Sequence, residues 1–400
     1  MVFINCVRVS SKLYGNVVII AAKQPQNVGI QSVVQRGISS KAMRHRLPKE
    51  SKPAPFPYKE KKYTFLKALF DTTSDRLDEN SKLILVEGPP AAGKGALAKE
   101  IAEDLDMHYL PSPTIAEHMV NSYGYNLKQL DSQLPETCKS YDETDFLRDP
   151  KQLNGTKAGR FQLTKFSLRY QRYIEALAHI LNTGQGVVMD RSPYSDLAYI
   201  AAMAEHGIVS RNIFNYYHQV RNNSLFAIWR PHLVVYLDVP VEETRRRIEA
   251  RNRPHEKDSL ATTPAYLQTL ENVHKKNYLK DISIHAEVLV YDGSKPVEPE
   301  IVVEDIERLN FEQYGPYDEK MKDWRSEDKW TFNNHRMTFT NDQDSLMQYL
   351  NVPGTRCPEV IIPPEDFRTF ERIFHEAPGN KYARGFNEDA GDKGALFKLS

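Results

Sequence analysis

Residues 83–100 read LILVEGPPAAGKGALAKE, which is an apolar run, a glycine-rich turn and the start of an amphipathic stretch. The apolar run within Lys82–Glu87 predicts a short buried strand. After the turn, Leu97, Ile101 and Leu105 recur at four-residue spacing, which predicts a helix with one apolar face. A strand that passes through a glycine-rich turn into a helix is the local order of a phosphate-binding loop.

The turn matches the pattern G-x-x-x-x-G-K at Gly88, Gly93 and Lys94. In this pattern backbone N–H groups point at phosphate oxygens, the helix N-terminus adds partial positive charge, and the lysine reaches the outer phosphates. The next residue is Gly95, where the motif has a Ser or Thr hydroxyl that ligates Mg²⁺. We therefore expect a loop that binds an anion but holds a metal–nucleotide complex poorly. A turn that binds nothing is the alternative.

Further apolar runs alternate with helical stretches through the body of the chain. The predicted strands are 186–190, 233–238 and 287–291, and the predicted helices are about 161–183, 195–229, 241–251 and 264–279. Strands separated by helices of this length favour a parallel sheet with helices on both faces. The predicted fold class is therefore α/β of the P-loop type, followed by an irregular C-terminal extension with little periodicity.

Charged side chains follow two of these predicted strands. Asp190 and Arg191 stand at a strand end, where open parallel sheets bind ligands, and such residues can hold Mg²⁺ and clamp phosphate. Arg247, Arg251 and Arg253 lie after the next strand, where they could close over phosphates as a lid. The alternatives are a strand-end ion pair and a solvated basic face.

The N-terminal region differs from the rest in charge. The first acidic residue is Glu50, and an acid-poor, basic, serine-containing start is typical of an organelle transit peptide. Residues 36–39, RGIS, resemble a mitochondrial processing site, although a basic tail that stays on is the alternative. The predicted parts are a transit peptide at 1–40, an extended segment at 41–79, the P-loop domain at 80–309 and, at 310–400, an extension that docks on a partner or forms a small subdomain.

Composition excludes several classes of function. The 400 residues carry 53 basic and 53 acidic side chains, which argues against a strongly basic nucleic-acid binder. Three cysteines make no disulfide framework, and no Cys/His spacing predicts a metal site. The longest run of Val, Ile and Ala covers only 17–22, whereas a membrane span needs about 20 apolar residues, so we expect no transmembrane helix.

The order of these motifs resembles the deoxynucleoside kinases over about residues 80–295. The resemblance rests on the phosphate loop, a Phe-Gln pair ending in Gln162 at the start of a long helix, the triplet D-R-S at 190–192 and the arginine-rich segment. It implies that Gln162 binds the nucleobase edge, that Arg191 works at the substrate hydroxyl and phosphate, and that Glu256 contacts the sugar.

Several chemical positions depart from the kinase pattern. The kinases carry a Glu between prolines as general base, but residues 110–113 read LPSP, and the hydroxyl of Ser112 is not a base near neutral pH. Glu117 is the next acid but is displaced by five residues, and His255 replaces the first lid Glu. Together with Gly95, these changes predict a fold with no catalytic residues. An active mitochondrial kinase that has moved its base and metal ligand is the alternative.

A narrower resemblance connects the chain to the deoxynucleoside-kinase-like accessory subunits of mitochondrial complex I. It rests on the segments 121–135, 184–196, 278–292 and 382–394. It implies a non-catalytic subunit that supports assembly and stability of the complex on the matrix side of the inner membrane, beside other complex I subunits near the membrane arm. It also implies a possible bound nucleotide or FAD, although the chain has no G-x-G-x-x-G dinucleotide motif.

Overall fold

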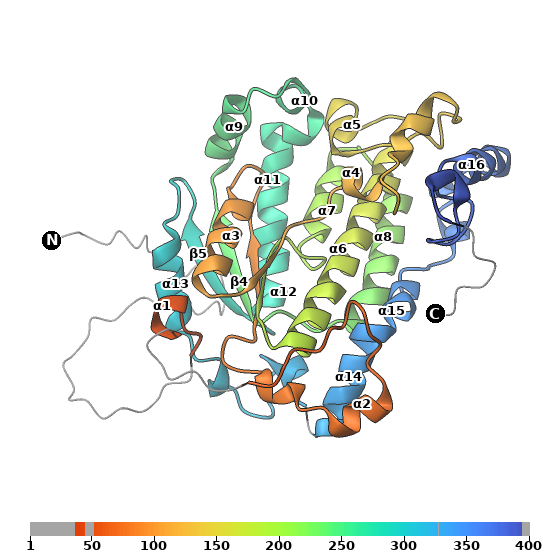
Figure 1. The fold of residues 1–400 in the computed structure, drawn as a ribbon. Coiled ribbons are helices and arrows are strands. Elements are labelled where there is room, and N and C mark those ends of the chain that lie inside the picture. Colours follow the sequence, from red (N-terminus) through yellow and green to blue (C-terminus); the bar gives the residue numbers. More distant parts are fainter. Residues whose placement is uncertain (1–36, 45–51, 327, 394–400) are drawn as a thin grey trace, which may run out of the picture.

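A five-stranded parallel sheet forms the centre of the molecule (Figure 1). The computed structural model describes residues 37–44, 52–326 and 328–393. The strands follow the order β2-β3-β1-β4-β5, so β1, which leads into the glycine-rich turn, lies at the middle. They are β1 (Leu83–Glu87), β2 (His108–Leu110), β3 (Val187–Asp190), β4 (Leu233–Asp238) and β5 (Glu287–Asp292). The predicted α/β fold with a parallel sheet is confirmed.

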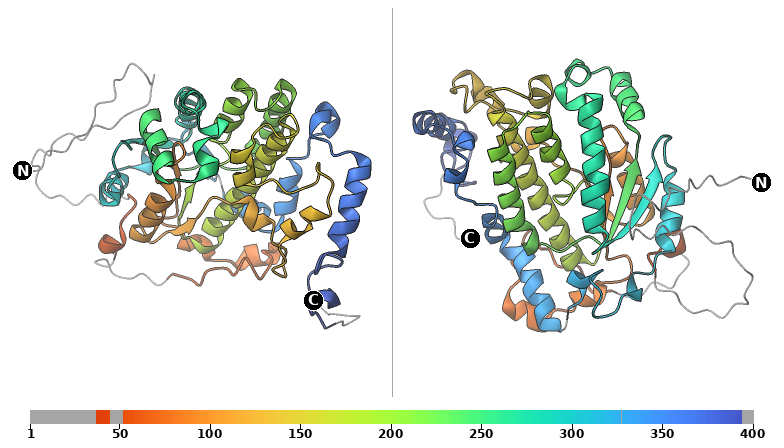
Figure 2. Two further views of the ribbon diagram at one scale, coloured as in Figure 1. Left: turned by 90° about the horizontal axis from the view of Figure 1, so that it is seen from above. Right: turned by 180° about the vertical axis from the view of Figure 1, so that it is seen from behind.

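Helices cover both faces of the sheet because side chains alternate along each strand (Figures 1 and 2). Leu83 and Leu85 of β1 pack into one apolar cluster, and Ile84 and Val86 pack into the other. The first face carries α6 (Thr156–Thr183), α7 (Leu197–Glu205), α8 (Arg211–Ser224), α11 (Pro264–Val273) and α12 (Leu279–Ile282); the second carries α3 (Lys94–Asp104) and α13 (Pro299–Glu307). Shorter connections contain α4 (Ile115–His118), α5 (Glu143–Arg148), α9 (Val241–Ala250) and α10 (Pro254–Lys257).

The long helix α6 begins five residues earlier than its apolar pattern predicts. Its first turn includes Gly159, which lowers helix propensity but lets α8 approach closely, since a Cβ there would lie 2.9 Å from Ile213. The helix ends as predicted at Gly184, whose φ of 72° is left-handed and whose Cβ would lie 2.6 Å from the carbonyl oxygen of Arg76. Within the described part of the chain, no helix is long and apolar enough to cross a membrane.

The C-terminal extension is more helical than its sequence pattern predicts. It contains α14 (Lys329–Asn341), α15 (Gln343–Gln348) and α16 (Pro364–Glu376). The side chain of Arg336 on α14 is fully buried, forms an ion pair with Asp71 and donates a 2.9 Å hydrogen bond to Asn182 Oδ1 at the end of α6. Periodicity was weak because α14 turns polar side chains inward, toward buried polar partners.

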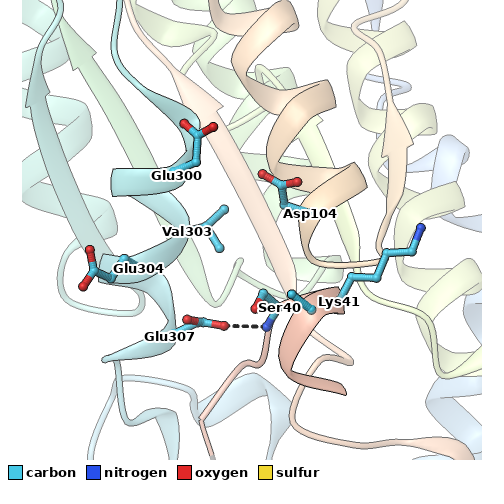
Figure 3. A pocket seen from close by; sticks show the side chains of 8 residues that line it. Ser40, Lys41, Asp104, Glu300, Val303, Glu304 and Glu307 are labelled. Atoms are coloured by element: carbon cyan, nitrogen blue, oxygen red, sulfur yellow. Dashed lines mark hydrogen bonds between the residues drawn. The ribbon is translucent and has the colours of Figure 1, made fainter. Parts of the chain in front are cut away.

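Residues 37–44, which end in α1 (Lys41–Arg44), are packed onto the second face of the sheet. Ile38 is 2% exposed and lies among apolar residues of α3 and α13. The N–H of Ser40 donates a 2.6 Å hydrogen bond to Glu307 Oε1 (Figure 3). Most of the predicted transit peptide, residues 1–36, falls outside the described residues, but its last four residues contact the domain.

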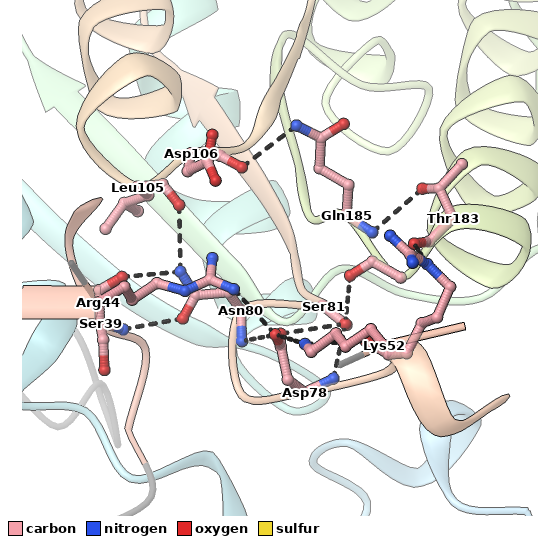
Figure 4. Close-up of polar contacts among 12 residues, drawn as sticks. Ser39, Arg44, Lys52, Asp78, Asn80, Ser81, Leu105, Asp106, Thr183 and Gln185 are labelled. Carbon is pink, nitrogen blue, oxygen red and sulfur yellow. Dashed lines mark hydrogen bonds and ion pairs between the residues drawn. The ribbon is translucent and has the colours of Figure 1, made fainter. Parts of the chain in front are cut away.

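Asn80, just before β1, is hydrogen-bonded to the same segment (Figure 4). Its amide group donates to the carbonyl oxygens of Ser39 at 2.7 Å and Leu105 at 3.1 Å, and its Oδ1 accepts from the Ser39 N–H at 2.9 Å. Beside it, Asp78 forms ion pairs with Arg44 and with Lys52 in the extended segment. That segment also contains α2 (Phe65–Phe70), so it is not extended throughout as predicted.

Candidate nucleotide site

The glycine-rich turn has the backbone of a phosphate-binding loop. Gly88 and Gly93 adopt φ values of 147° and 86°, and a Cβ at Gly88 would lie 2.7 Å from the Leu237 carbonyl oxygen. Lys94 begins α3, is 6% exposed, and donates a 2.5 Å hydrogen bond to the carbonyl oxygen of Pro89 in the same loop. An entering phosphate would therefore replace a contact that the loop makes with itself.

Two arginines, one after β3 and one at the end of α9, lie near Lys94 of this loop. Arg191 follows β3 with a left-handed φ of 67°, and its guanidinium lies 4.9 Å from the ring centre of Tyr199. Burial lowers the pKa of Lys94 well below its usual value, and the nearby positive charges of Arg191 and Arg251 lower it further. Because these cations are close enough to repel one another, an anion between them would be stabilised.

One oxygen of the Asp190 carboxylate is already bound by protein groups. Its Oδ1 accepts a 2.6 Å hydrogen bond from the Ser112 N–H and a 3.4 Å contact from the Tyr109 hydroxyl. A Cβ at Gly95 would lie 3.5 Å from Asp190 Oδ2 and 3.3 Å from the Tyr109 oxygen. A serine at that position would thus stand beside Asp190, as a shared magnesium site requires, but glycine supplies no oxygen.

A second carboxylate lies deeper at the end of β1. Glu87 is 1% exposed and accepts a 2.8 Å hydrogen bond from the hydroxyl of Ser192. Burial is the main cause of its raised pKa, which hydrogen bonds and the charge of Lys94 partly offset. Within the described residues, no three His, Cys, Asp or Glu side chains form a group that could hold a metal ion. At the loop itself, Gly95 supplies no hydroxyl and Asp190 Oδ1 is bound to Ser112, so this donor set fits Mg²⁺ poorly.

Gln162 belongs to a buried polar cluster beneath the site. Its amide donates a 2.6 Å hydrogen bond to Asp196 Oδ2, which also accepts from the Tyr217 hydroxyl at 2.9 Å. The other oxygen of Asp196 is paired with Arg169, whose pKa burial lowers to about 10, with the charge of Arg191 as a lesser cause. Sequence reasoning missed Arg169 and Asp196. For Arg169 the available signal was its spacing of seven residues from Gln162, which places both residues on one side of α6. No local pattern pointed to Asp196.

Near Ser112, where the kinase resemblance expects a general base, a buried lysine pairs with a carboxylate. Lys165 of α6 donates to the carbonyl oxygen of Pro113 at 2.5 Å and pairs with Glu143 at 2.7 Å. Burial lowers its pKa to about 8, and the charge of Arg169 acts in the same direction. Glu117 is exposed and lies 4.0 Å from Arg172 on the surface. The loop at Ser112 is therefore bound to Lys165 through the Pro113 carbonyl oxygen and to Asp190 through the Ser112 N–H.

The arginine-rich segment divides into two parts. Arg247 is bound by Glu243 and by the carbonyl oxygen of Gly293, both at 2.6 Å, so it is not free to close over phosphates. Arg251 and Arg253 are exposed at the start of the predicted lid.

Glu256 anchors this predicted lid. Arg253 pairs with its Oε1 at 3.2 Å, while its Oε2 is buried without a hydrogen-bond partner. The structure therefore brings Lys94, Asp190, Arg191 and Arg251 close together at the phosphate loop, whereas Gln162 lies in a separate buried polar cluster.

Comparison with known proteins connects the chain to one family. The deoxynucleoside kinase family model matches residues 84–323. A Mus musculus protein named NADH dehydrogenase (ubiquinone) 1 alpha subcomplex subunit 10, mitochondrial, is 37% identical over 341 residues, which cover 84% of this chain and 90% of the relative. The Bos taurus protein of the same name is 37% identical over 333 residues, covering 82% and 91%.

More distant relatives are enzymes. The deoxyguanosine kinase of Dictyostelium discoideum is 25% identical over 239 residues, which cover 60% of this chain and 73% of the relative. Among solved structures, deoxyadenosine kinase from M. mycoides with bound dATP is 19% identical with a TM-score of 0.41, covering 56% of this chain and 96% of that chain.

Proposed function

The chain belongs to the deoxynucleoside kinase family, and from that premise we propose that it is a non-catalytic accessory subunit of mitochondrial respiratory complex I, NADH:ubiquinone oxidoreductase. One observation carries the proposal. Relatives that bear the name of a complex I subunit match 82% to 84% of the chain, which is more than the kinase domain at 84–323.

The chemistry of the cleft supports the absence of catalysis. Gly95 offers no metal ligand, and Ser112 offers no general base. Removing a general base costs a rate factor of about 10²–10⁴. The Ser112 N–H also binds Asp190, so the carboxylate nearest the missing ligand is held by protein contacts.

The proposed place of the protein is the matrix side of the mitochondrial inner membrane, as a peripheral subunit beside others near the membrane arm. A transit peptide precedes the folded domain, and its removed part ends before the predicted residue 40, because Ile38 is buried and Ser39 and Ser40 are hydrogen-bonded to the domain. The extension from residue 310 onward docks on neighbouring subunits. The proposed role is support of assembly and stability of the complex. Disruption of the gene tests this role, because it should lower the amount of assembled complex I, and re-expression of the chain should restore it.

We also propose that the cleft retains a nucleotide. Lys94, Arg191 and Arg251 supply the charge for its phosphates, and a cavity of 510 Å³ borders the loop at Ala91 and Gly93. The FAD implied by the resemblance stays a prediction.

An active mitochondrial deoxynucleoside kinase is the second candidate. It is favoured by Lys94, Arg191, Gln162 and Glu256, which all match the kinase motifs. The purified chain would be assayed with ATP, Mg²⁺ and each of the four deoxynucleosides, with Lys94→Ala as control. Our proposal expects equal turnover of the two proteins, and faster turnover of the unaltered chain would establish the kinase instead.

A further inference from the structure

The short helix α2 turns its large apolar side chains toward solvent. Phe65, Leu66, Leu69 and Phe70 are 51%, 69%, 53% and 85% exposed, whereas Ala68 is its one buried residue. These four positions share one side of the helix, since residues four apart are neighbours. A surface helix ordinarily buries this side, so α2 has the reverse orientation.

A tryptophan from the C-terminal extension enlarges this apolar side. Trp330 on α14 is 47% exposed, and its ring centre lies 5.2 Å from that of Phe65 in an edge-to-face arrangement. Figures 1 and 2 show α2 beside α14 at one end of the molecule. We call Phe65, Leu66, Leu69, Phe70 and Trp330 the α2 patch.

Buried contacts hold the α2 patch in place. Tyr63, just before α2, donates its N–H to Asn341 at 2.9 Å, and Asp71, just after α2, is paired with Arg336. The guanidinium of Arg336 lies 3.8 Å from the ring centre of Tyr63. The apolar side chains are therefore presented by an ordered support on α14.

Basic side chains are concentrated in the sequence that leads into and forms α2. Lys59, Lys61, Lys62 and Lys67 are exposed within nine residues of sequence, against the single exposed acid Glu60 in that stretch. At the start of α14, the sequence 327–329 (Glu-Asp-Lys) carries one more acid than base. The positive charge therefore lies on the α2 segment and not on α14.

We propose that the α2 patch docks on the surface of an anionic phospholipid bilayer. Aromatic and leucine side chains enter the boundary between headgroups and acyl chains, while the lysines stay at the level of the phosphates. A bilayer presents anions above an apolar layer, which complements a lysine-rich segment that exposes large apolar side chains. The inference rests on the peripheral membrane placement proposed above, for which it names the contacting surface.

Vesicle sedimentation with the purified chain tests this surface without complex I. We expect binding to phosphatidylcholine–phosphatidylglycerol vesicles and at least about tenfold weaker binding to phosphatidylcholine alone. The double variant Leu66→Ser, Phe70→Ser should weaken anionic binding by about tenfold or more. The matched control is Phe226→Ser, since Phe226 is 63% exposed but lies outside the patch. Circular dichroism and melting temperature confirm that the variants fold.

Intrinsic fluorescence gives an independent readout. The chain has three tryptophans, and Trp330 is more exposed than Trp229 and Trp324. Brominated anionic lipids should quench the emission of the unaltered chain, and Trp330→Phe should abolish most of the quenching while sedimentation persists. Absence of binding to anionic vesicles overturns the proposal, and so does binding that the double variant leaves unchanged. A photo-crosslinker at position 70 in mitochondrial membranes that captures only protein also overturns it. None of these results depends on whether the chain migrates with complex I.

Discussion

The N–H of Ser112 donates a 2.6 Å hydrogen bond to the carboxylate of Asp190. The resemblance to the kinases expects a general base at Ser112, and Asp190 ends the strand beside the phosphate loop. Gly95 borders the same carboxylate, since a Cβ there would lie 3.5 Å from Asp190 Oδ2. Two positions that depart from the kinase pattern, Gly95 and Ser112, therefore meet at one side chain.

Magnesium should contribute little to nucleotide binding. In the unaltered chain we expect ATP affinities with and without Mg²⁺ to differ by less than about threefold, because Gly95 supplies no ligand and Asp190 is bound to Ser112. Gly95→Ser places a hydroxyl beside Asp190 and should make binding about tenfold tighter with Mg²⁺ than without it. Calorimetry measures the ATP affinity of each protein with and without Mg²⁺. Gly95→Ala is the control, because it adds the Cβ without the oxygen. A strong Mg²⁺ effect in the unaltered chain would show that another group has replaced the ligand.

Arg336 should be essential to the contact between the C-terminal extension and the segment at 41–79. Arg336→Met leaves the buried Asp71 carboxylate without its ion pair and should lower the free energy of unfolding by about 3–5 kcal/mol. Denaturant unfolding followed by circular dichroism measures the loss. The control is Arg372→Met, whose pair with Glu376 is 65% and 67% exposed and should matter little. Equal stability of the two variants would contradict this role.

Lys165 should make stability depend on pH above neutrality. Its pKa of about 8 in the folded chain compares with 10.5 for an unperturbed lysine. Between these values the unfolded chain binds more protons, so the free energy of unfolding should rise with pH, by at most about 1.4 kcal/mol per pH unit. Lys165→Met should remove this part of the rise, whereas Lys99→Met, at an exposed position of α3, should retain it. Urea unfolding at pH 7.5, 9 and 10.5, values chosen to span roughly that window, measures the difference; identical slopes in all three proteins would refute the assignment.

Asn80 should stabilise the fold mainly through the segment that precedes α1. In a chain that begins at Gly37, Asn80→Ala removes the hydrogen bonds to Ser39 and Leu105 and should cost about 2 kcal/mol of unfolding free energy. In a chain that begins at Lys41 the Ser39 contacts are already gone, so the same substitution should cost about half as much. Thermal unfolding of both chains, each with and without the substitution, measures how much of the effect of Asn80 depends on residues 37–40. Equal costs in both chains would show that residues 37–40 do not dock in solution.

The central sheet could be predicted from the sequence because its strands are continuous apolar runs, which parallel strands covered on both faces require. The boundaries of α6 were harder to predict. Gly184 marks its end, but Gly159 weakened the helical pattern at its start, and only the close approach of Ile213 explains that glycine. The short edge strand β2 is not among the strands that the apolar runs predict, because it spans only three residues.

Site residues that belong to a local sequence motif could be predicted. Site residues that are brought together only by tertiary packing could not. Lys94 and Asp190 follow from local patterns. By contrast, Asp196 pairs with Arg169 across two helices, and such a contact has no local signature. Helix α14 was missed for a similar reason, because its buried arginine is compensated by Asp71, 265 residues away in sequence.

Native electrophoresis of mitochondria after mild detergent solubilisation tests the central claim most directly. The chain is followed by antibody beside a core subunit of complex I. The account predicts that the chain migrates with assembled complex I and that assembled complex I is depleted in mitochondria that lack the chain. Migration as a free protein of about the 46.0 kDa mass of the chain, with complex I assembled normally in its absence, would contradict the account.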